Sequence, residues 1–380
     1  MDIRRALHAP VESALKGRMA FIGGPRQVGK TTLALSLLGP KATPRHPGYL
    51  NWDNPSVPPA LRRGLLPPNE PRIVLDEIHK YARWRTLVKG LYDTEKGHRQ
   101  FIVTGSARLD HYRKGGDSLV GRYRYFRLHP LSLPELERAM GPDVGHLSAL
   151  LTFGGFPEPL IARDARTLRL WQRERLTRVV REDLRDLERV REVSLIEELV
   201  DMLPDKVGSL LSVRGVREDL DIDHKTAERW ITILERLYVC FRLPPFGSRR
   251  IRALKKQQKL YLWDWSMVPD AGPRFENLVA AQLLKFCHWQ EDVEGHRMEL
   301  RFLRDTDGRE VDFVVLKNRA PLFAVECKTG GKAVSPAIRY FAERTSIPAF
   351  YQVHQQDTYL QTGNITIVPF ARFCRDLAMP

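Results

Sequence analysis

A glycine-bounded segment near the amino terminus carries residue types suited to phosphate chemistry. Residues 21–38 read FIGGPRQVGKTTLALSLL, so an apolar run ends in glycines and a Gly-Lys-Thr opens a helical pattern. In such a loop, glycines turn backbone N–H groups toward phosphates, the lysine reaches the β- and γ-phosphate oxygens, and the threonine hydroxyl binds Mg²⁺. We therefore predict a site for ATP and Mg²⁺, with Thr31 as a metal ligand, at Gly24, Pro25, Arg26, Gln27, Val28, Gly29, Lys30, Thr31 and Thr32.

An acidic pair follows the next apolar run. Residues 73–75 are Ile-Val-Leu, which is typical of a buried strand, and Asp76 and Glu77 come directly after them. Asp76 at the strand tip is predicted to hold Mg²⁺ through water, and Glu77 is predicted to polarise the attacking water as a general base. A simple helix cap is the alternative role for this pair.

Polar residues also end a third apolar run, at residues 100–104. Ligands of open parallel sheets bind at the carboxyl ends of the strands, so Thr104 and Ser106 are predicted to sense the γ-phosphate or to position water. Ser106 could instead cap a helix. Further along, GRYRYFR is a basic strand pattern, and its Arg122 is the candidate arginine finger, acting in cis or on a neighbouring subunit. A solvated basic strand is the alternative.

Four further sequence motifs follow the phosphate loop along the chain and include the residues described above. LDEIHK, FIVTGSARL, GRYRYFRLHPLSLPEL and GGFPEP follow the phosphate loop. With this set the chain resembles a prokaryotic family of AAA-type ATPases, similar to archaeal-type ATPases, whose C-terminal domain of unknown function is related to PD-(D/E)XK nucleases. The resemblance covers nearly the whole chain and implies ATP binding. Because AAA-type relatives often work as rings, it also implies a homo-oligomer.

The carboxyl-terminal third carries a second set of acidic residues with a lysine. Asp312 lies in the alternating strand pattern EVDFVV, and Glu326-Cys327-Lys328 ends the next strand pattern, PLFAVECK. Carboxylates on adjacent strands can chelate Mg²⁺, and Lys328 would lower the pKa of the attacking water or hold the scissile phosphate. Glu276, on a predicted amphipathic helix, would complete a metal site with Asp312 and Glu326. A surface ion pair between Glu326 and Lys328, or a docking module without catalysis, is the alternative.

The middle of the chain reads as helical. Residues 163–191 predict a long charged helix, whose Arg-rich face is either solvated or turned toward DNA. Two helices follow, over residues 212–220 and from about 224 to 237, and then a short strand; this order resembles a winged helix-turn-helix. Its exposed basic residues would contact DNA, or the module would dock on protein: His224, Lys225, Arg229 and Arg236. The basic run 249–264 is interpreted as a linker touching phosphates or as a charged edge strand.

Composition limits the partners and the compartment. The 380 residues include 61 Lys and Arg against 46 Asp and Glu, a net charge of +15, which favours a polyanion such as DNA. Four scattered cysteines without a CxxC pair argue against a zinc site and fit a reducing compartment. We expect no membrane span and no signal peptide, because no apolar run is long enough, and hence a cytoplasmic location.

Together these patterns predict an α/β multidomain protein. The expected parts are a P-loop AAA-type ATPase core (residues 1–150), a helical linker with a winged helix (151–250) and a PD-(D/E)XK nuclease-like mixed α/β domain (251–380). The leading hypothesis is an ATP-hydrolysing protein that remodels DNA, branched or otherwise structured, or cleaves it with a metal. The second is an ATP-dependent switch with protein partners, in which the nuclease-like domain is a docking module. The third is a DNA-binding scaffold with ATP as a structural ligand.

Overall fold

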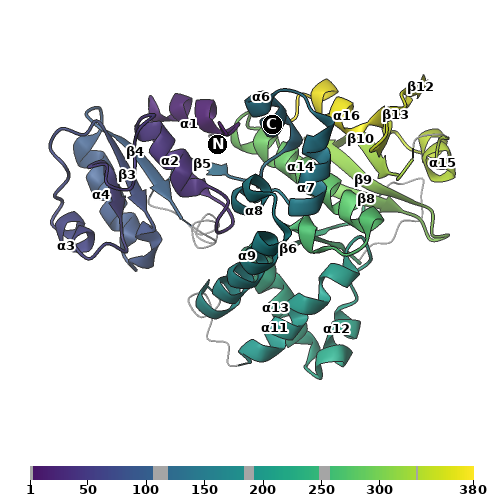
Figure 1. Cartoon of the computed structure of the whole chain (residues 1–380), viewed down its shortest axis with the longest axis horizontal. Helices are drawn as coiled ribbons and strands as arrows, with labels where there is room; N and C mark the ends of the chain where they lie inside the picture. Colours follow the sequence, from purple (N-terminus) through teal and green to yellow (C-terminus); the bar gives the residue numbers. More distant parts are fainter. Residues whose placement is uncertain (1–2, 106–118, 184–191, 248–256, 331–332) are drawn as a thin grey trace. The chain divides into compact units, whose positions relative to one another are not determined.

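The computed structural model describes residues 3–105, 119–183, 192–247, 257–330 and 333–380 (Figure 1). It is a mixed α/β chain with two compact units, residues 2–130 and 131–380. The three-domain division with boundaries at 150 and 250 stays a prediction. Among the described residues, no helix has both the length and the apolar character that a membrane span requires.

The first unit is built on a five-stranded parallel sheet in the order β2-β3-β4-β1-β5. The strands that the sequence predicted in this region are all present: β1 (Met19–Gly23), β2 (Tyr49–Asn51), β3 (Arg72–Asp76), β4 (Gln100–Thr104) and β5 (Tyr123–Arg127). The helices that connect or flank them are α1 (His8–Leu15), α2 (Lys30–Leu38), α3 (Val57–Arg62), the short 3₁₀ helix η1 (Ile78–Lys80) and α4 (Trp84–Glu95). Because every strand is parallel, the carboxyl ends of β1, β3 and β4 meet at one edge.

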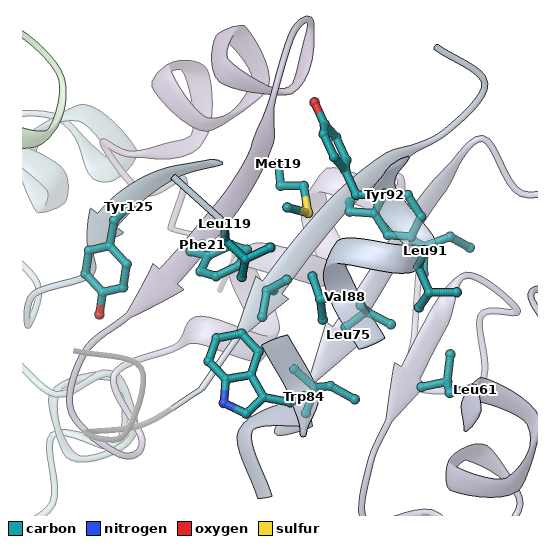
Figure 2. Packing of buried hydrophobic residues seen from close by; sticks show 14 of the residues in the cluster. Met19, Phe21, Leu61, Leu75, Trp84, Val88, Leu91, Tyr92, Leu119 and Tyr125 are labelled. Atoms are coloured by element: carbon teal, nitrogen blue, oxygen red, sulfur yellow. The ribbon is translucent and has the colours of Figure 1, made fainter. Parts of the chain in front are cut away.

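One face of this sheet packs against α4. Figure 2 shows Met19, Phe21 and Leu75 from the strands among Trp84, Val88 and Leu91 of α4, and all of them are buried. The near-continuous apolar composition of the strands is what a sheet covered on both faces requires. This core fixes the strand ends, and therefore the positions of the polar residues that follow them.

The second unit begins with helices. They are α6 (Leu133–Met140), α7 (Val144–Phe153), α8 (Pro157–Ala162), α9 (Ala165–Arg178), the π-helical turn η3 (Val179–Asp183), α11 (Val193–Met202), η4 (Pro204–Lys206), α12 (Val213–Leu220) and α13 (His224–Arg236). The predicted long helix begins at residue 165 instead of 163, because Arg163 adopts a left-handed conformation (φ 50°) that ends α8, and Asp164 caps α9. Residues 184–191 of that prediction lie outside the described part of the chain. One arginine of this helix is not on an exposed basic face. Arg175 is 2% exposed, and its guanidinium lies 4.4 Å from the centroid of the Phe156 ring.

A two-stranded antiparallel sheet follows α13. It consists of β6 (Cys240–Leu243) and β7 (Lys259–Leu262), and the short 3₁₀ helix η5 (Trp265–Met267) comes after it. The prediction of a linker is wrong for residues 259–262, because all four are buried in a paired strand. The alternative interpretation as a strand is confirmed for these four residues, although the charge of Lys259 is buried, at 1% exposure. Residues 248–256 of the basic run lie outside the described residues.

The chain ends in a six-stranded mixed sheet in the order β12-β13-β11-β10-β9-β8. Its strands are β8 (Met298–Arg304), β9 (Glu310–Lys317), β10 (Ala320–Cys327), β11 (Phe350–His354), β12 (Leu360–Thr362) and β13 (Ile365–Pro369), and its helices are α14 (Ala271–Asp292), α15 (Pro336–Arg344) and α16 (Phe370–Asp376). Phe323 contacts Phe286 of α14, whereas its neighbour Ala324 packs with Phe341 of α15. Helices therefore cover both faces, because successive strand residues point in opposite directions.

Candidate functional site

The segment between β1 and α2 has the backbone of a phosphate-binding loop. Gly24 has φ 144° and Gly29 has φ 98°, values that L side chains rarely adopt, and Gln27 is also left-handed at φ 60°. At Gly24 a side chain would also collide with the carbonyl oxygen of Leu128. The glycines at these two positions are therefore required by the backbone itself, and α2 begins at Lys30 with its N–H groups facing the loop.

The side chain of Lys30 folds back over this loop. It is 8% exposed, and its ammonium group donates to the carbonyl oxygens of Gly24 at 3.0 Å and Pro25 at 2.6 Å. A buried ammonium group needs such acceptors. The lysine is thus held above the loop, where the phosphates of a nucleotide would lie.

Asp76 is the centre of a hydrogen-bond network at the end of β3. Its Oδ2 accepts from the hydroxyl of Thr31 at 3.0 Å and from that of Tyr49 at 2.5 Å. Its Oδ1 accepts from the hydroxyl of Thr104. The structure thus brings together three predicted site residues from α2, β3 and β4. Tyr49 was missed, although a hydroxyl on the strand next to the acidic strand was a signal for it.

Glu77 follows Asp76 in a strained conformation. It is left-handed, at φ 57°, and its N–H donates to the carbonyl oxygen of Thr104 at 3.1 Å. Burial raises the pKa of its carboxyl group above the ordinary value, and the charge of Lys30 opposes that rise. The Nε2 of His79 lies 3.5 Å from its Oε2. Glu77 is therefore a carboxylate of increased basicity beside the loop, as a general base requires.

Arg122, the predicted arginine finger, is not at this edge. Arg122 precedes β5, where it pairs with Asp93 at 2.8 Å, and its carbonyl oxygen accepts from the N–H of Met19 at the start of β1. It lies roughly 16 Å of strand away from the carboxyl edge. Arg122 therefore does not serve the site of its own chain, and its action on a neighbouring subunit stays a prediction. Ser106 lies outside the described residues.

Two residues of the predicted carboxyl-terminal site, Glu276 and Asp312, contact Lys259, which no sequence motif indicated. The register of β9 with β10, in which Phe313 pairs with Val325, places Asp312 beside Glu326. Asp312 Oδ2 accepts from the N–H of Cys327 at 2.8 Å. The ammonium of Lys259 lies 3.5 Å from Asp312 Oδ1 and 3.2 Å from Glu276 Oε1, and it also contacts Glu310.

Glu326 and Lys328 form a pair of their own. Lys328 Nζ lies 2.6 Å from Glu326 Oε1, and the other oxygen of Glu326 is buried without a hydrogen-bond partner. Burial raises the pKa of Glu326, and Lys328 opposes the rise. The predicted ion pair between the two is present. It accounts for one oxygen of Glu326.

Three protein families match successive segments of the chain. Residues 16–137 match an AAA domain, residues 144–273 match a domain of unknown function (DUF8612), and residues 271–373 match a domain of unknown function (DUF4143). The phosphate loop, Asp76, Glu77 and Thr104 all lie within the first match. The chain therefore contains an AAA domain and, at its carboxyl end, a DUF4143 domain.

Two mycobacterial proteins are similar to most of this chain. One is the uncharacterized protein Mb2031c of Mycobacterium bovis and another is Rv2008c of Mycobacterium tuberculosis, each 26% identical over 345 residues, which is 84% of this chain and 73% of the relative. Among solved structures, Aeropyrum pernix ORC1 in complex with DNA is 16% identical (73% of this chain, 91% of that chain, TM-score 0.33). Thermotoga maritima RuvB is also 16% identical (64% and 89%, TM-score 0.30).

The two predicted metal sites, one in the AAA domain and one in the DUF4143 domain, differ in how well their side chains fit a divalent cation. At the first, Thr31 Oγ1 and Asp76 Oδ2 lie 3.0 Å apart beside the loop, and these are the hard oxygen donors that Mg²⁺ prefers. At the second, Glu276 and Asp312 face the ammonium of Lys259, and Glu326 pairs with Lys328. Among the described residues, no group of three or more His, Cys, Asp or Glu is arranged to hold a metal ion. The first site fits Mg²⁺, and the second, in this arrangement, does not fit a divalent metal.

The exposed side of α13 carries the basic residues that the sequence predicted. Asp223 caps the helix through the N–H groups of Lys225 and Thr226, and Trp230 and Ile233 bury its other side. The side chains that remain on the surface are those of His224, Lys225, Arg229 and Arg236. The helix thus has an apolar face that packs and a cationic face in solvent.

Proposed function

We propose that this ATPase hydrolyses ATP with Mg²⁺ and uses the hydrolysis to act on DNA. The observation that carries the first half is the convergence of Thr31, Asp76 and Thr104 at one strand edge, next to Lys30 and Glu77. Hydroxyl, carboxylate and ammonium groups are brought together there from α2, β3 and β4. Such convergence is what a triphosphate and its metal need.

Each residue has a separate part in hydrolysis. The loop N–H groups and Lys30 bind the phosphates and stabilise the charge that develops on the γ-phosphate oxygens. Thr31 and Asp76 would hold the metal, which would supply positive charge to neutralise the phosphates. Glu77 accepts a proton from the attacking water, and its raised pKa makes it a better base. Thr104 holds Asp76 in place and is close enough to the same edge to position that water.

The second half of the proposal is supported by basic surfaces. The first unit has a cavity of about 660 Å³ at the amino ends of the strands, and no Asp or Glu is among the described residues that line it. Its basic lining residues are Lys16, Arg18, Arg72, Lys96, His98 and Arg99. In the second unit, α12, α13 and the β6–β7 sheet are the element order of a winged helix, which supports our interpretation that α13 faces DNA. Lys and Arg on such surfaces bind phosphates without regard to base sequence.

For the DUF4143 domain we propose recognition of branched or otherwise structured DNA. Asp312, Glu326 and Lys328 are the groups that cleavage would use, and Lys259 would first have to leave the cluster. This obstacle favours a second candidate function, in which the protein is an ATP-dependent switch and the domain docks on a protein partner. In either case we expect a homo-oligomer, which would bring Arg122 of one copy to the nucleotide of the next.

DNA binding in different nucleotide states tests the proposal. The affinity for a fluorescent four-way junction and for a linear duplex would be measured with ATP in Glu77→Gln and with ADP in the wild type. We expect salt-sensitive binding whose strength differs between the two nucleotide states. Equal affinity in both nucleotide states would show that ATP hydrolysis does not change DNA binding. Absence of DNA binding would favour the ATP-dependent switch with protein partners. Parallel incubation with Mg²⁺ or Mn²⁺ would detect any cleavage.

A further inference from the structure

The carboxylate cluster of the DUF4143 domain contains its own cation. Lys259 is 1% exposed, and its ammonium lies between Glu276 of α14 and two residues of β9, Glu310 and Asp312. Glu310 and Asp312 are two positions apart in the strand and therefore point to the same side. The carboxylates converge on one point from a helix and a strand, and the atom at that point is Lys259 Nζ.

The oxygen atoms of the cluster are already directed at hydrogen-bond donors. Glu276 Oε1 accepts from the hydroxyl of Tyr261 at 2.7 Å and from Lys259 at 3.2 Å. Asp312 accepts from the N–H of Cys327 through one oxygen and faces Lys259 through the other. A divalent ion would need these same lone pairs. It would also lie within a few ångströms of a buried positive charge, where the repulsion is strong because little water screens it.

The position of Lys259 is fixed from outside the six-stranded sheet. Lys259 is the first residue of β7, which pairs with Leu243 of β6 and bridges to Leu210 in the segment before α12. In the same segment, Gly208 is left-handed at φ 72°, and a side chain there would come within 3.2 Å of Glu276 Oε1. The backbone of the helical part is therefore packed directly against the cluster. A shift of β7 would move the ammonium relative to α14 and β9.

We infer that Lys259 takes the place of a metal ion in this cluster and excludes divalent cations as long as β7 stays in its position. The cluster is then an ion-pair centre that joins the β6–β7 sheet to α14 and β9. It becomes a metal site only when Lys259 is withdrawn or neutralised. This inference concerns the DUF4143 domain alone and does not depend on ATP hydrolysis, so it can fail while the proposed function holds.

Manganese binding to the full-length protein tests the inference. Nucleotide-free wild type, Asp312→Asn, Lys259→Gln and Lys259→Gln/Asp312→Asn would be titrated with Mn²⁺, and the free ion would be measured by electron paramagnetic resonance. We expect wild type and Asp312→Asn to bind equally little, Lys259→Gln to gain one Mn²⁺ per chain, and the double variant to lose it again. Lys259→Arg keeps the charge and should not gain a site.

A matched control separates the cluster from a general effect of removing a buried lysine. Lys285 is also buried, and its Nζ lies 2.5 Å from Oε2 of Glu135. Lys285→Gln should bind no additional Mn²⁺. If Lys259→Gln does not fold, Lys259→Met/Glu310→Gln is used in its place. This variant removes one charge of each sign and leaves the net charge of the cluster unchanged.

Two results would overturn the inference. The first is Mn²⁺ binding by the wild type that Asp312→Asn abolishes, because it would show that a metal enters while Lys259 is present. This comparison needs no Lys259 variant. The second is a folded Lys259→Gln, or in its place a folded Lys259→Met/Glu310→Gln, that gains no manganese.

Discussion

The hydroxyl of Thr31 donates to the carboxylate of Asp76 across 3.0 Å, and this bond joins the start of α2 to the end of β3. The two residues are far apart in the sequence, yet strand and helix packing brings their oxygen atoms together beside the loop.

Replacing Lys30 with Ala should weaken ATP binding. The ammonium is held over the loop by the carbonyl oxygens of Gly24 and Pro25, where we expect it to contact the phosphates. A hydrogen bond to a charged group contributes about 1.5–3 kcal/mol, so the dissociation constant should rise about 10-fold to 100-fold. Titration with a fluorescent ATP analogue measures this change. Lys41→Ala, at an exposed lysine of the same unit, should leave the affinity unchanged.

Replacing Glu77 with Gln should remove hydrolysis and keep binding. A general base contributes about 10²-fold to 10⁴-fold to the rate, so kcat should fall by at least about 100-fold while the dissociation constant for ATP changes little. The wild type must have Glu77 ionised to react. Because burial raises its pKa, activity should decline at a higher pH than for an ordinary carboxylate as the solution is acidified. Steady-state rates of phosphate release across pH provide both results, and an acid limb at the ordinary pKa of glutamate would contradict the assignment.

Glu276 should make the stability of the protein depend on pH. Burial and the neighbouring Asp312 raise its pKa from 4.5 to about 7, so between these values the folded chain holds a proton that the unfolded chain has released. The free energy of unfolding should therefore fall as pH rises through this window, by up to about 1.4 kcal/mol per pH unit for one proton. Urea unfolding of wild type and Glu276→Gln at pH 5 and pH 8 isolates this term. Equal pH dependence in the two proteins would show that Glu276 ionises normally.

The basic cavity of the first unit should contribute to DNA affinity. Arg18→Glu/Lys96→Glu reverses two exposed charges at its lining and should weaken binding of any DNA sequence, with a shallower dependence on salt. Lys41→Glu/Arg45→Glu changes the same net charge at exposed positions outside the residues that line the cavity. Fluorescence anisotropy with one duplex at several salt concentrations compares the pairs. An equal loss in both would mean that only total charge matters.

The sequence predicted the parts of the molecule whose residues are close together in the chain. The phosphate loop, the acidic strand end and the helices α12 and α13 each have a local pattern, and the structure has them where they were expected. The bond of Tyr49 to Asp76 and the position of Lys259 had no such pattern, because each depends on strand pairing between distant segments. Lys259 in particular belongs to a basic run that suggested solvent exposure. Its burial results from three carboxylates supplied by α14 and β9.

Arg122 illustrates a second limit. Its place beside a basic strand made it a reasonable candidate for the nucleotide site. The sequence pattern does not show, however, which edge of the sheet the start of that strand will occupy. The parallel pairing of Met19 with Tyr123 decides that question and places Arg122 at the amino edge.

The measurement that tests the central claim most directly is the rate of ATP hydrolysis with and without DNA. Purified full-length protein would be assayed alone, with a linear duplex and with a four-way junction, beside Lys30→Ala as the inactive control. If ATP hydrolysis is used to act on DNA, at least one of these DNAs should raise the rate severalfold, and added salt should reverse the increase. A rate that is the same under all three conditions, in a protein that hydrolyses ATP, would contradict the claim and favour a switch that acts on protein partners.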